Sequence, residues 1–294
     1  MGEGTGVMHV GCGQITWREV PEAAVLTDIS VAGYEGAAPK LVPPRSAEET
    51  LRVYAEYGLV AAPPYLGAPF WEREQREHIV GRASEVARFA KALGCTELYV
   101  AAHGPYETRS GKTRQDVAGH VGSEDGLDDL QWATLTATLN AVGEATLQEG
   151  VRACFHNHVG TVVETEEEME RLLASTDPAL VFLGPDTGHL AWGGVDPVAF
   201  FRRHLERIKT AHLKDISAEV RRRGVAEGWG YRRFADGGIF QELGEGDVDL
   251  PGILNALRSV DFDGWVVVET DVTQLPTPRD SAVVSRRYLR GAGL

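Results

Sequence analysis

The sequence predicts an α/β fold in which eight parallel strands and their helices close into a single-domain (β/α)8, or TIM, barrel. Short apolar runs alternate with amphipathic stretches from one end of the chain to the other. Eight such runs occur in 294 residues, a length that is common for this barrel. No Pro- or Ser-rich linker divides the chain, so we expect residues 1–294 to form one domain.

The predicted strands are short apolar runs, several of them rich in Val and Ile, which pack well in a buried parallel sheet. In chain order they are Met8–Ile15, Tyr34–Ala38, Leu59–Ala62, Glu97–Ala102, Val151–His156, Leu180–Leu183, Ile208–Leu213 and Trp265–Glu269. An open doubly wound sheet is the alternative, but it usually carries a glycine fingerprint after its first strand. Gly11-Cys12-Gly13 lacks the third glycine of that fingerprint, so we do not expect a nucleotide site.

The predicted helices show apolar residues at spacings of three and four. They are Ala47–Tyr57, Arg73–Leu93, Leu127–Glu149, Thr165–Ala174, Pro197–Glu206, Leu250–Arg258 and Ser281–Leu289. Two of them begin with a clear signal. Thr165 precedes three glutamates, as an N-cap followed by carboxylates at the positive end of the helix dipole, and Asp196-Pro197 is a second start.

The longest segments without a periodic pattern are Gly104–Gly126 and Gly224–Gly246. Each follows a predicted strand, on the side where barrels place their active sites. We expect both to cover the opening of the barrel. Arg109, Trp229, Tyr231 and Arg232 are the groups expected to contact substrate; the alternative is that these segments form contacts in a homo-oligomer.

Composition and charge limit the partners. Hydrophobic residues make up 43% of the chain and charged residues 24%, as in an ordinary globular protein. The net charge of −14 opposes binding to nucleic acid or to anionic membranes, which leaves small molecules. Three widely spaced cysteines indicate neither a disulfide framework nor a zinc site. Residues 1–7 lack the basic and apolar regions of a leader, so we expect a cytoplasmic protein.

Metal-ligand side chains fall at the ends of four consecutive predicted strands. His156 and His158 end the fifth, and their spacing of two puts them on one face. The next three strand ends carry Asp186 with His189, His212 with Lys214, and Glu269. Because the carboxyl ends of barrel strands ring one opening, these side chains are expected to converge there. Imidazoles and carboxylates together can bind a divalent cation.

Each of these residues also has a structural interpretation. A single histidine at a strand end is often only hydrogen-bonded, and Asp186 could be a turn residue. Glu269 follows three valines, where a buried carboxylate is costly unless it is paired or bound to metal. Lys214 is either an acid/base group or an ion-pair partner of Asp215 or Asp186. Taken together, the four strand ends favour a metal site.

These motifs resemble those of a known family. The segments are Phe155–Thr165 (FHNHVGTVVET), Asp186–His189 (DTGH), His212–Asp215 (HLKD), Leu243–Asp247 (LGEGD) and Gly264–Glu269 (GWVVVE). They resemble the sugar phosphate isomerase/epimerase superfamily of xylose isomerase-like barrels. Within it, the chain is most similar to the myo-inosose (2-keto-myo-inositol) dehydratase branch. The amino-terminal half matches chiefly through Ile15-Thr16-Trp17, Gly33-Tyr34 and His103.

The resemblance implies a divalent cation, Mn²⁺, Co²⁺ or Mg²⁺, held by the last four strands. Asp186, His212 and Glu269 match three ligand positions. His156 stands where isomerases and epimerases of the superfamily have a glutamate, and Glu164 is the alternative fourth ligand. The branch also tends to carry a glutamate after strand two, where this chain has alanines.

The chemistry implied by the resemblance is proton removal beside a carbonyl, through an enediolate. Elimination of a β-hydroxyl makes a dehydratase of a keto-cyclitol or keto-sugar; reprotonation makes an isomerase or epimerase. The same site also suits a lyase that releases an aglycone from a 3-keto glycoside, and the same barrel suits a sugar-binding protein without activity. His189 or Lys214 is the expected base, His103 or His158 the expected acid, and Trp17 and His103 the expected substrate contacts. Glu269 would act at the metal.

Overall fold

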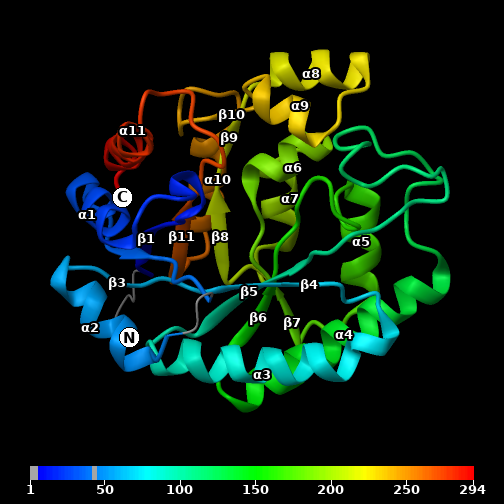
Figure 1. Ribbon diagram of the computed structural model, residues 1–294, viewed down its shortest axis with the longest axis horizontal. Coiled ribbons are helices and arrows are strands. Elements are labelled where there is room, and N and C mark those ends of the chain that lie inside the picture. Colours follow the sequence, from blue (N-terminus) through cyan, green and yellow to red (C-terminus); the bar gives the residue numbers. More distant parts are fainter. Residues whose placement is uncertain (1–5, 42–44) are drawn as a thin grey trace.

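The computed structural model describes residues 6–41 and 45–294, and it forms the expected parallel barrel (Figure 1). Residues 1–5, part of the segment on which the expectation of no leader rests, lie outside the described residues. One sheet has the order β3-β2-β1-β11-β8 and the other β4-β5-β6-β7. The strands are β1 (Met8–Cys12), β2 (Gly36–Ala37), β3 (Val60–Ala61), β4 (Tyr65–Ala68), β5 (Glu97–Ala102), β6 (Arg152–Phe155), β7 (Val181–Leu183), β8 (Thr210–Leu213) and β11 (Gly264–Val268).

The two sheets join at both edges, which closes the barrel. Parallel bridges Leu183–Ile208 and Asp186–His212 connect β7 to β8. On the other side the chain itself continues from β3 into β4, so that these two short strands form one bent position in the barrel. Pro63-Pro64 separates them, because proline has no N–H to donate to a ladder. The predicted strand at Leu59–Ala62 is therefore only the first part of this position, and β4 was not predicted.

Helices surround the barrel, with α3 and α4 along one side and α1 and α11 together on another (Figure 1). They are α1 (Glu22–Ala32), α2 (Ala47–Glu56), α3 (Arg76–Ala92), α4 (Asp129–Gln148), α5 (Glu166–Ser175), α6 (Thr187–Gly193), α7 (Pro197–His204), α10 (Leu250–Arg258) and α11 (Pro278–Gly291). Both expected helix starts are confirmed. Thr165 accepts from the Glu168 N–H in a capping box, and Asp196 accepts from two N–H groups of α7.

The segment Gly224–Gly246 is not irregular, which corrects the expectation from its sequence. It contains the end of α8 (Ala218–Glu227), all of α9 (Tyr231–Asp236) and β10 (Phe240–Gln241), which pairs antiparallel with β9 (Asp215–Ile216). The physical reason is a separate apolar cluster in which Phe234 and Phe240 pack on Trp192 of α6. Gly104–Gly126 is largely without regular structure, as expected.

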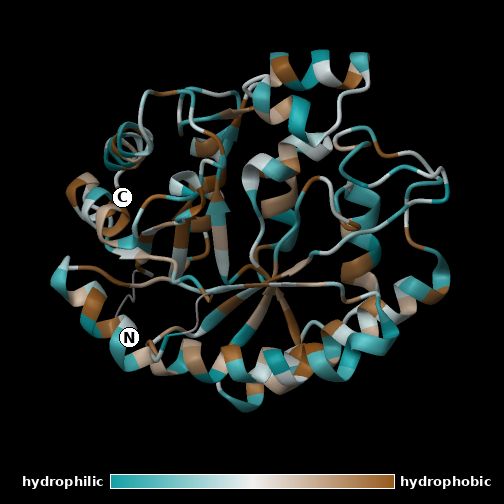
Figure 2. Ribbon diagram, in the orientation of Figure 1, coloured by the Kyte–Doolittle hydropathy of each residue, from teal (hydrophilic) through white to brown (hydrophobic). Residues whose placement is uncertain are grey.

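Hydrophobic residues recur along the strands and alternate with hydrophilic ones along the helices (Figure 2), and the buried ones form a large core cluster. Tyr99 of β5 closes the barrel interior beneath the site, and its hydroxyl lies 2.6 Å from Thr210 Oγ1. Cys12, Cys95 and Cys154 are buried free thiols. Within the described residues, none of the helices combines the length and the apolar composition that crossing a bilayer requires.

Candidate active site

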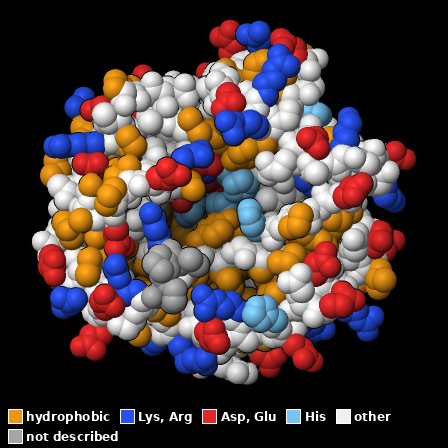
Figure 3. All heavy atoms as spheres, viewed as in Figure 1, with side chains coloured by type: hydrophobic (Ala, Val, Ile, Leu, Met, Phe, Trp, Pro, Cys, Tyr) orange, Lys and Arg blue, Asp and Glu red, His pale blue; other side chains and the backbone are white. Residues whose placement is uncertain are grey.

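A cavity of about 710 Å³ opens at the carboxyl ends of the strands. Figure 3 looks into it, with histidine side chains on its floor. Its wall includes His103, His156, His158, Tyr231, Glu269 and Asp271. A second hollow of about 590 Å³ lies between α10 and α11 and is lined by none of the predicted site residues. The first cavity is therefore the candidate active site.

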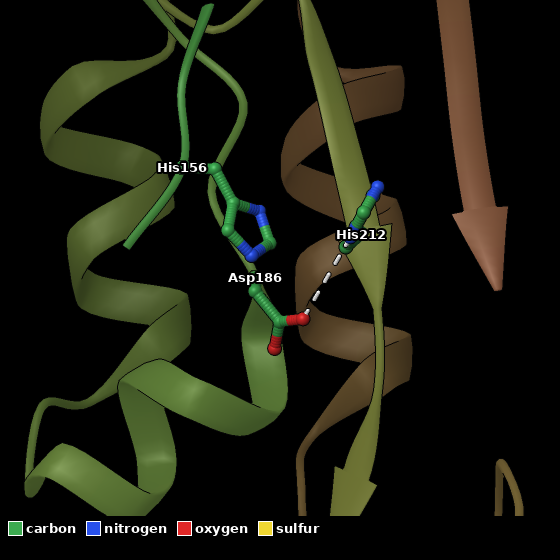
Figure 4. Close-up of side chains that lie close together, drawn as sticks. All are labelled: His156, Asp186 and His212. Atoms are coloured by element: carbon green, nitrogen blue, oxygen red, sulfur yellow. Dashed lines mark ion pairs between the residues drawn. The ribbon is translucent and has the colours of Figure 1, made fainter. Parts of the chain in front are cut away.

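Three of the predicted ligands lie close together, His156 in the wall of this cavity and Asp186 and His212 buried beside it. His156 follows β6, Asp186 caps α6 and His212 lies in β8. One ligand atom from each lies within 4.8 Å of the others; the His156 ring points toward Asp186, and His212 Nδ1 is 3.9 Å from Asp186 Oδ2 (Figure 4). His156 Nδ1, His212 Nδ1 and Asp186 Oδ2 are buried without a hydrogen-bond partner. Two imidazoles and a carboxylate that are buried this close together, each with an atom that makes no hydrogen bond, fit a divalent cation.

Burial also sets the protonation of this group. It lowers the pKa of His156 well below its ordinary value, and the neighbouring imidazoles add to that effect. His156 is therefore neutral, as a metal ligand must be. Burial raises the pKa of Asp186, against the opposing effect of the Lys214 ammonium and the His212 ring.

Glu269, the fourth predicted ligand, lies beside His212. It directly follows β11, and its Oε2 is 3.2 Å from His212 Nδ1. Burial alone would raise its pKa, but the His212 ring and the Lys214 ammonium hold the pKa of Glu269 well below its usual value. Gly13 makes room for it, because a Cβ at that position would collide with Glu269 Oε1.

The Lys214 ammonium connects the carboxylates of the site. Its Nζ lies 2.7 Å from Asp271 Oδ1, 3.2 Å from Asp186 Oδ2 and 3.6 Å from Glu269 Oε2. Burial would lower the pKa of Lys214, but these carboxylates raise it well above its ordinary value. Of the two partners expected from the sequence, Asp186 is the one in contact. The Asp215 carboxylate instead accepts backbone N–H groups, including those of Gly244 and Val248.

His158 and His189 form a second group, with Asp271, that could geometrically hold a metal ion. Their ring centroids are 3.8 Å apart, and His189 Nε2 is 3.1 Å from Lys214 Nζ. The Lys214 ammonium therefore contacts His189 and Asp271 of this group, where a bound metal ion would otherwise lie. His158 lines the cavity, whereas His189 and Lys214 are buried beneath its wall. Burial lowers the pKa of His158 to about 4, and Lys214 reinforces that shift.

A family model described as the xylose isomerase-like TIM barrel matches residues 26–291. The chain belongs to this family. Inosose dehydratases are among its curated relatives. The protein from Geobacillus kaustophilus is 32% identical over 222 residues, covering 74% of this chain and 69% of that protein. The protein from Clostridium tetani is 34% identical over 161 residues, covering 54% of each chain. This chain spans about half the length of several of these relatives, among them the Clostridium tetani protein.

Solved structures share the fold of this chain. A probable 3-DHS dehydratase from Bacillus anthracis is 16% identical, with a TM-score of 0.70 over 96% of this chain and 99% of that one. A 3-keto-D-glucoside 4-epimerase from E. coli, also 16% identical, has a TM-score of 0.70 over 97% of this chain and 100% of that one. The expected superfamily and its barrel are confirmed, and so is the similarity to inosose dehydratases.

Glu164, the alternative fourth ligand, is not part of the group formed by His156, Asp186 and His212. Its two carboxylate oxygens accept the backbone N–H groups of Gly119 and Gly160, each at 2.6 Å. Arg114, which is 2% exposed, lies 3.8 Å from Glu164 and forms a bidentate pair with Glu168. Glu164 therefore fastens the irregular Gly104–Gly126 segment to the loop after β6. Burial raises its pKa to about 7, although Arg114 and the N–H groups oppose that shift.

Replacing Glu164 by glutamine is expected to loosen residues 104–126, because an amide NH₂ would face one of the two N–H donors. Hydrogen exchange of that segment should accelerate. The folded pKa of Glu164, about 7, is above its ordinary value of 4.5, so its protonated form stabilises the fold. The stability advantage of the wild type over the variant should therefore shrink as the pH rises from about 4.5 to about 7.

The matched control is Glu167→Gln, the same change at an exposed position on α5. It should alter neither the exchange of residues 104–126 nor the pH dependence of unfolding. Unchanged exchange in the Glu164 variant would show that the carboxylate does not hold the segment.

Four residues that were expected to contact substrate do not line the cavity. Trp17 is buried, and its indole donates to Asp28 at 3.0 Å. Trp229 packs in the apolar cluster under α9. The Arg109 guanidinium donates to the Ser123 carbonyl, and Arg232 pairs with Asp236. None of the four lines the cavity, whereas His103 and Tyr231 do.

The cavity wall also contains residues that were not among the predicted contacts. Tyr65, at the start of β4, has its ring 5.2 Å from that of His156. Gln115 lines the wall and donates to the Gly160 carbonyl. Asp271 binds both Lys214 and the Tyr231 hydroxyl. Its position just after Glu269, past the end of a buried strand, was a usable signal.

Proposed function

We propose that the chain is a metal-dependent carbon–oxygen lyase that eliminates water from a keto-cyclitol or keto-sugar. The observation that carries this proposal is the buried group of His156, Asp186 and His212, whose ligand atoms lie within 4.8 Å of one another at the wall of the cavity that His156 lines. The similarity to inosose dehydratases supports a cyclic polyol as the substrate class. Such a small molecule fits a cavity of about 710 Å³.

His156, Asp186, His212 and Glu269 are the residues that would hold the cation. Their nitrogen and oxygen donors suit Mn²⁺ or Co²⁺, with Mg²⁺ as the alternative. When bound, a divalent cation supplies Lewis-acid polarisation of a keto oxygen. Lys214 then balances the charge of the buried carboxylates and fixes Asp186 and Glu269 in place. Lys214 and His189 do not line the cavity, so we assign them positioning roles.

His158 is the base in this proposal. Its Nδ1 lies 2.7 Å from the Val159 carbonyl, which can only accept, so Nδ1 carries the proton and Nε2 is free. Burial keeps the ring neutral, and it lines the cavity. Nε2 of His158 takes the proton α to the carbonyl, and the electron pair of that C–H bond forms the new double bond. The C–O bond at the β-carbon breaks, and His103 donates a proton so that water leaves.

A substrate panel tests this proposal. Keto-cyclitols and keto-sugars with a β-hydroxyl should give an ultraviolet-absorbing unsaturated or diketone product with the metal-loaded enzyme. A chelator should abolish the reaction, and added Mn²⁺ or Co²⁺ should restore it. Turnover that survives complete metal removal would contradict the proposal, as would a panel that yields only isomers.

We further propose that residues 1–294 act as one domain in the cytoplasm.

A further inference from the structure

The cavity has a second polar end, at the carboxyl ends of β1 and β2. Gln14, Arg18 and Lys40 line it there, away from the strands that carry the three-ligand group. Gln14 is 5% exposed, and its Nε2 donates to the Ala38 carbonyl and to the Tyr54 hydroxyl. Its Oε1 is buried without any partner. A buried acceptor in a cavity wall needs a hydrogen-bond donor, and a bound hydroxyl would supply one.

Two cations stand beside this acceptor. Arg18 and Lys40 are both exposed at the cavity wall, and no carboxylate lies within 4.0 Å of either in residues 6–41 and 45–294. The carboxylates of the same wall, Glu269 and Asp271, are already paired with Lys214. Two unpaired cations at the mouth of one cavity are notable in a chain with a net charge of −14, and they attract an anion.

The backbone at Arg18 supports a functional position. Arg18 has φ of 37° without being glycine or asparagine, a conformation that costs energy. The hydroxyl of Thr16, two residues before Arg18, donates to the Thr270 carbonyl at 2.5 Å, which holds this turn against the segment that follows β11. The Arg18 guanidinium in turn donates to the Asp271 carbonyl at 3.5 Å. The turn thus keeps a guanidinium at the edge of the site.

We propose that the substrate carries an acidic group, a carboxylate or a phosphate, which binds Arg18 and Lys40, while Gln14 Oε1 accepts a hydrogen bond from a substrate hydroxyl beside it. This inference rests on the proposed function and narrows its substrate class to keto-cyclitols or keto-sugars with an anionic substituent. The acid lies at the β1–β2 end of the cavity, and the keto group lies at the end formed by β6, β7 and β8.

Calorimetric titration with inorganic phosphate tests the subsite without any need for turnover. Phosphate should bind the full-length enzyme, and the double variant Arg18→Gln/Lys40→Gln should weaken that binding by about 10-fold or more. The control Arg82→Gln/Lys91→Gln removes the same charge from α3, outside the barrel, and should bind like the wild type. Asp186→Asn should also keep phosphate binding. Loss in Asp186→Asn would place the anion on the cation and overturn the inference.

Steady-state kinetics with matched substrates then show whether the subsite prefers a carboxylate or a phosphate. For one keto-cyclitol ring in neutral, carboxylated and phosphorylated forms, one acidic form should exceed the neutral form in kcat/KM by about 10-fold or more. The double variant should lose that preference, so that its kcat/KM for the acidic form falls to that for the neutral form. Equal kcat/KM for all three forms in the wild type overturns the inference. If no form is turned over, the proposed function fails, and phosphate binding still decides whether the subsite exists.

Discussion

Replacing Asp186 by asparagine is expected to lower turnover by about 10³-fold or more, because Lewis-acid stabilisation contributes several kcal/mol. The variant should also purify with little metal. Oδ2 of Asp186 is one of the three orphaned donor atoms, and the variant would place an amide NH₂ or a weaker neutral oxygen there. The fold should survive, because Oδ1 caps α6 by accepting from the His189 N–H, and asparagine is an equally good N-cap.

The matched control for this change is Asp196→Asn. Asp196 is also an N-cap aspartate, at the start of α7, but it does not line the cavity. It should bind metal and turn over substrate like the wild type. Elemental analysis of the purified proteins and circular dichroism separate loss of metal from loss of fold. Full metal occupancy with unchanged turnover in Asp186→Asn would refute the assigned metal site.

Replacing His158 by asparagine is expected to lower kcat by about 10²–10⁴-fold, which is the usual contribution of a general base. Asparagine keeps an N–H donor near the position of Nδ1, which faces the Val159 carbonyl, and removes Nε2. KM and metal content should change little, because His158 does not belong to the group formed by His156, Asp186 and His212. Steady-state kinetics with elemental analysis measure this split.

His204→Asn provides the comparison. His204 is a partly buried histidine on α7 that contacts Glu170, far from the cavity wall. That variant should keep the kcat of the wild type. A normal kcat in His158→Asn would exclude His158 as the base, and a parallel loss of metal would place it among the ligands instead.

The barrel and the ligand group were predictable because both follow from local rules. Apolar runs mark buried strands, and polar residues that directly follow such runs must meet at one rim of a closed barrel. This rule placed His156, Asp186, His212 and Glu269 together from the sequence. It also found Asp196 and Thr165 as helix starts, because N-caps act through neighbouring backbone groups only.

Contacts between distant segments were not predictable. Glu164 resembles any other carboxylate near a helix start, and only the tertiary fold brings Gly119 to it. Trp17 and Trp229 looked available because an aromatic residue in a loop gives no sign of whether it is buried. The strand β4 was hidden because Pro63-Pro64 interrupts its pattern. The short helix α9 forms because tertiary packing, and not its own periodicity, stabilises it.

Mass spectrometry of the products formed in D₂O tests elimination most directly. The metal-loaded enzyme, given a keto-cyclitol with a β-hydroxyl, should yield a product that has lost one molecule of water, and no dehydrated product should form after chelation. An epimerase or isomerase would instead return the starting formula with deuterium at the α-carbon. Dehydrated product is the result expected of a metal-dependent lyase. Deuterated isomers alone, across the neutral and acidic substrates, would contradict that function.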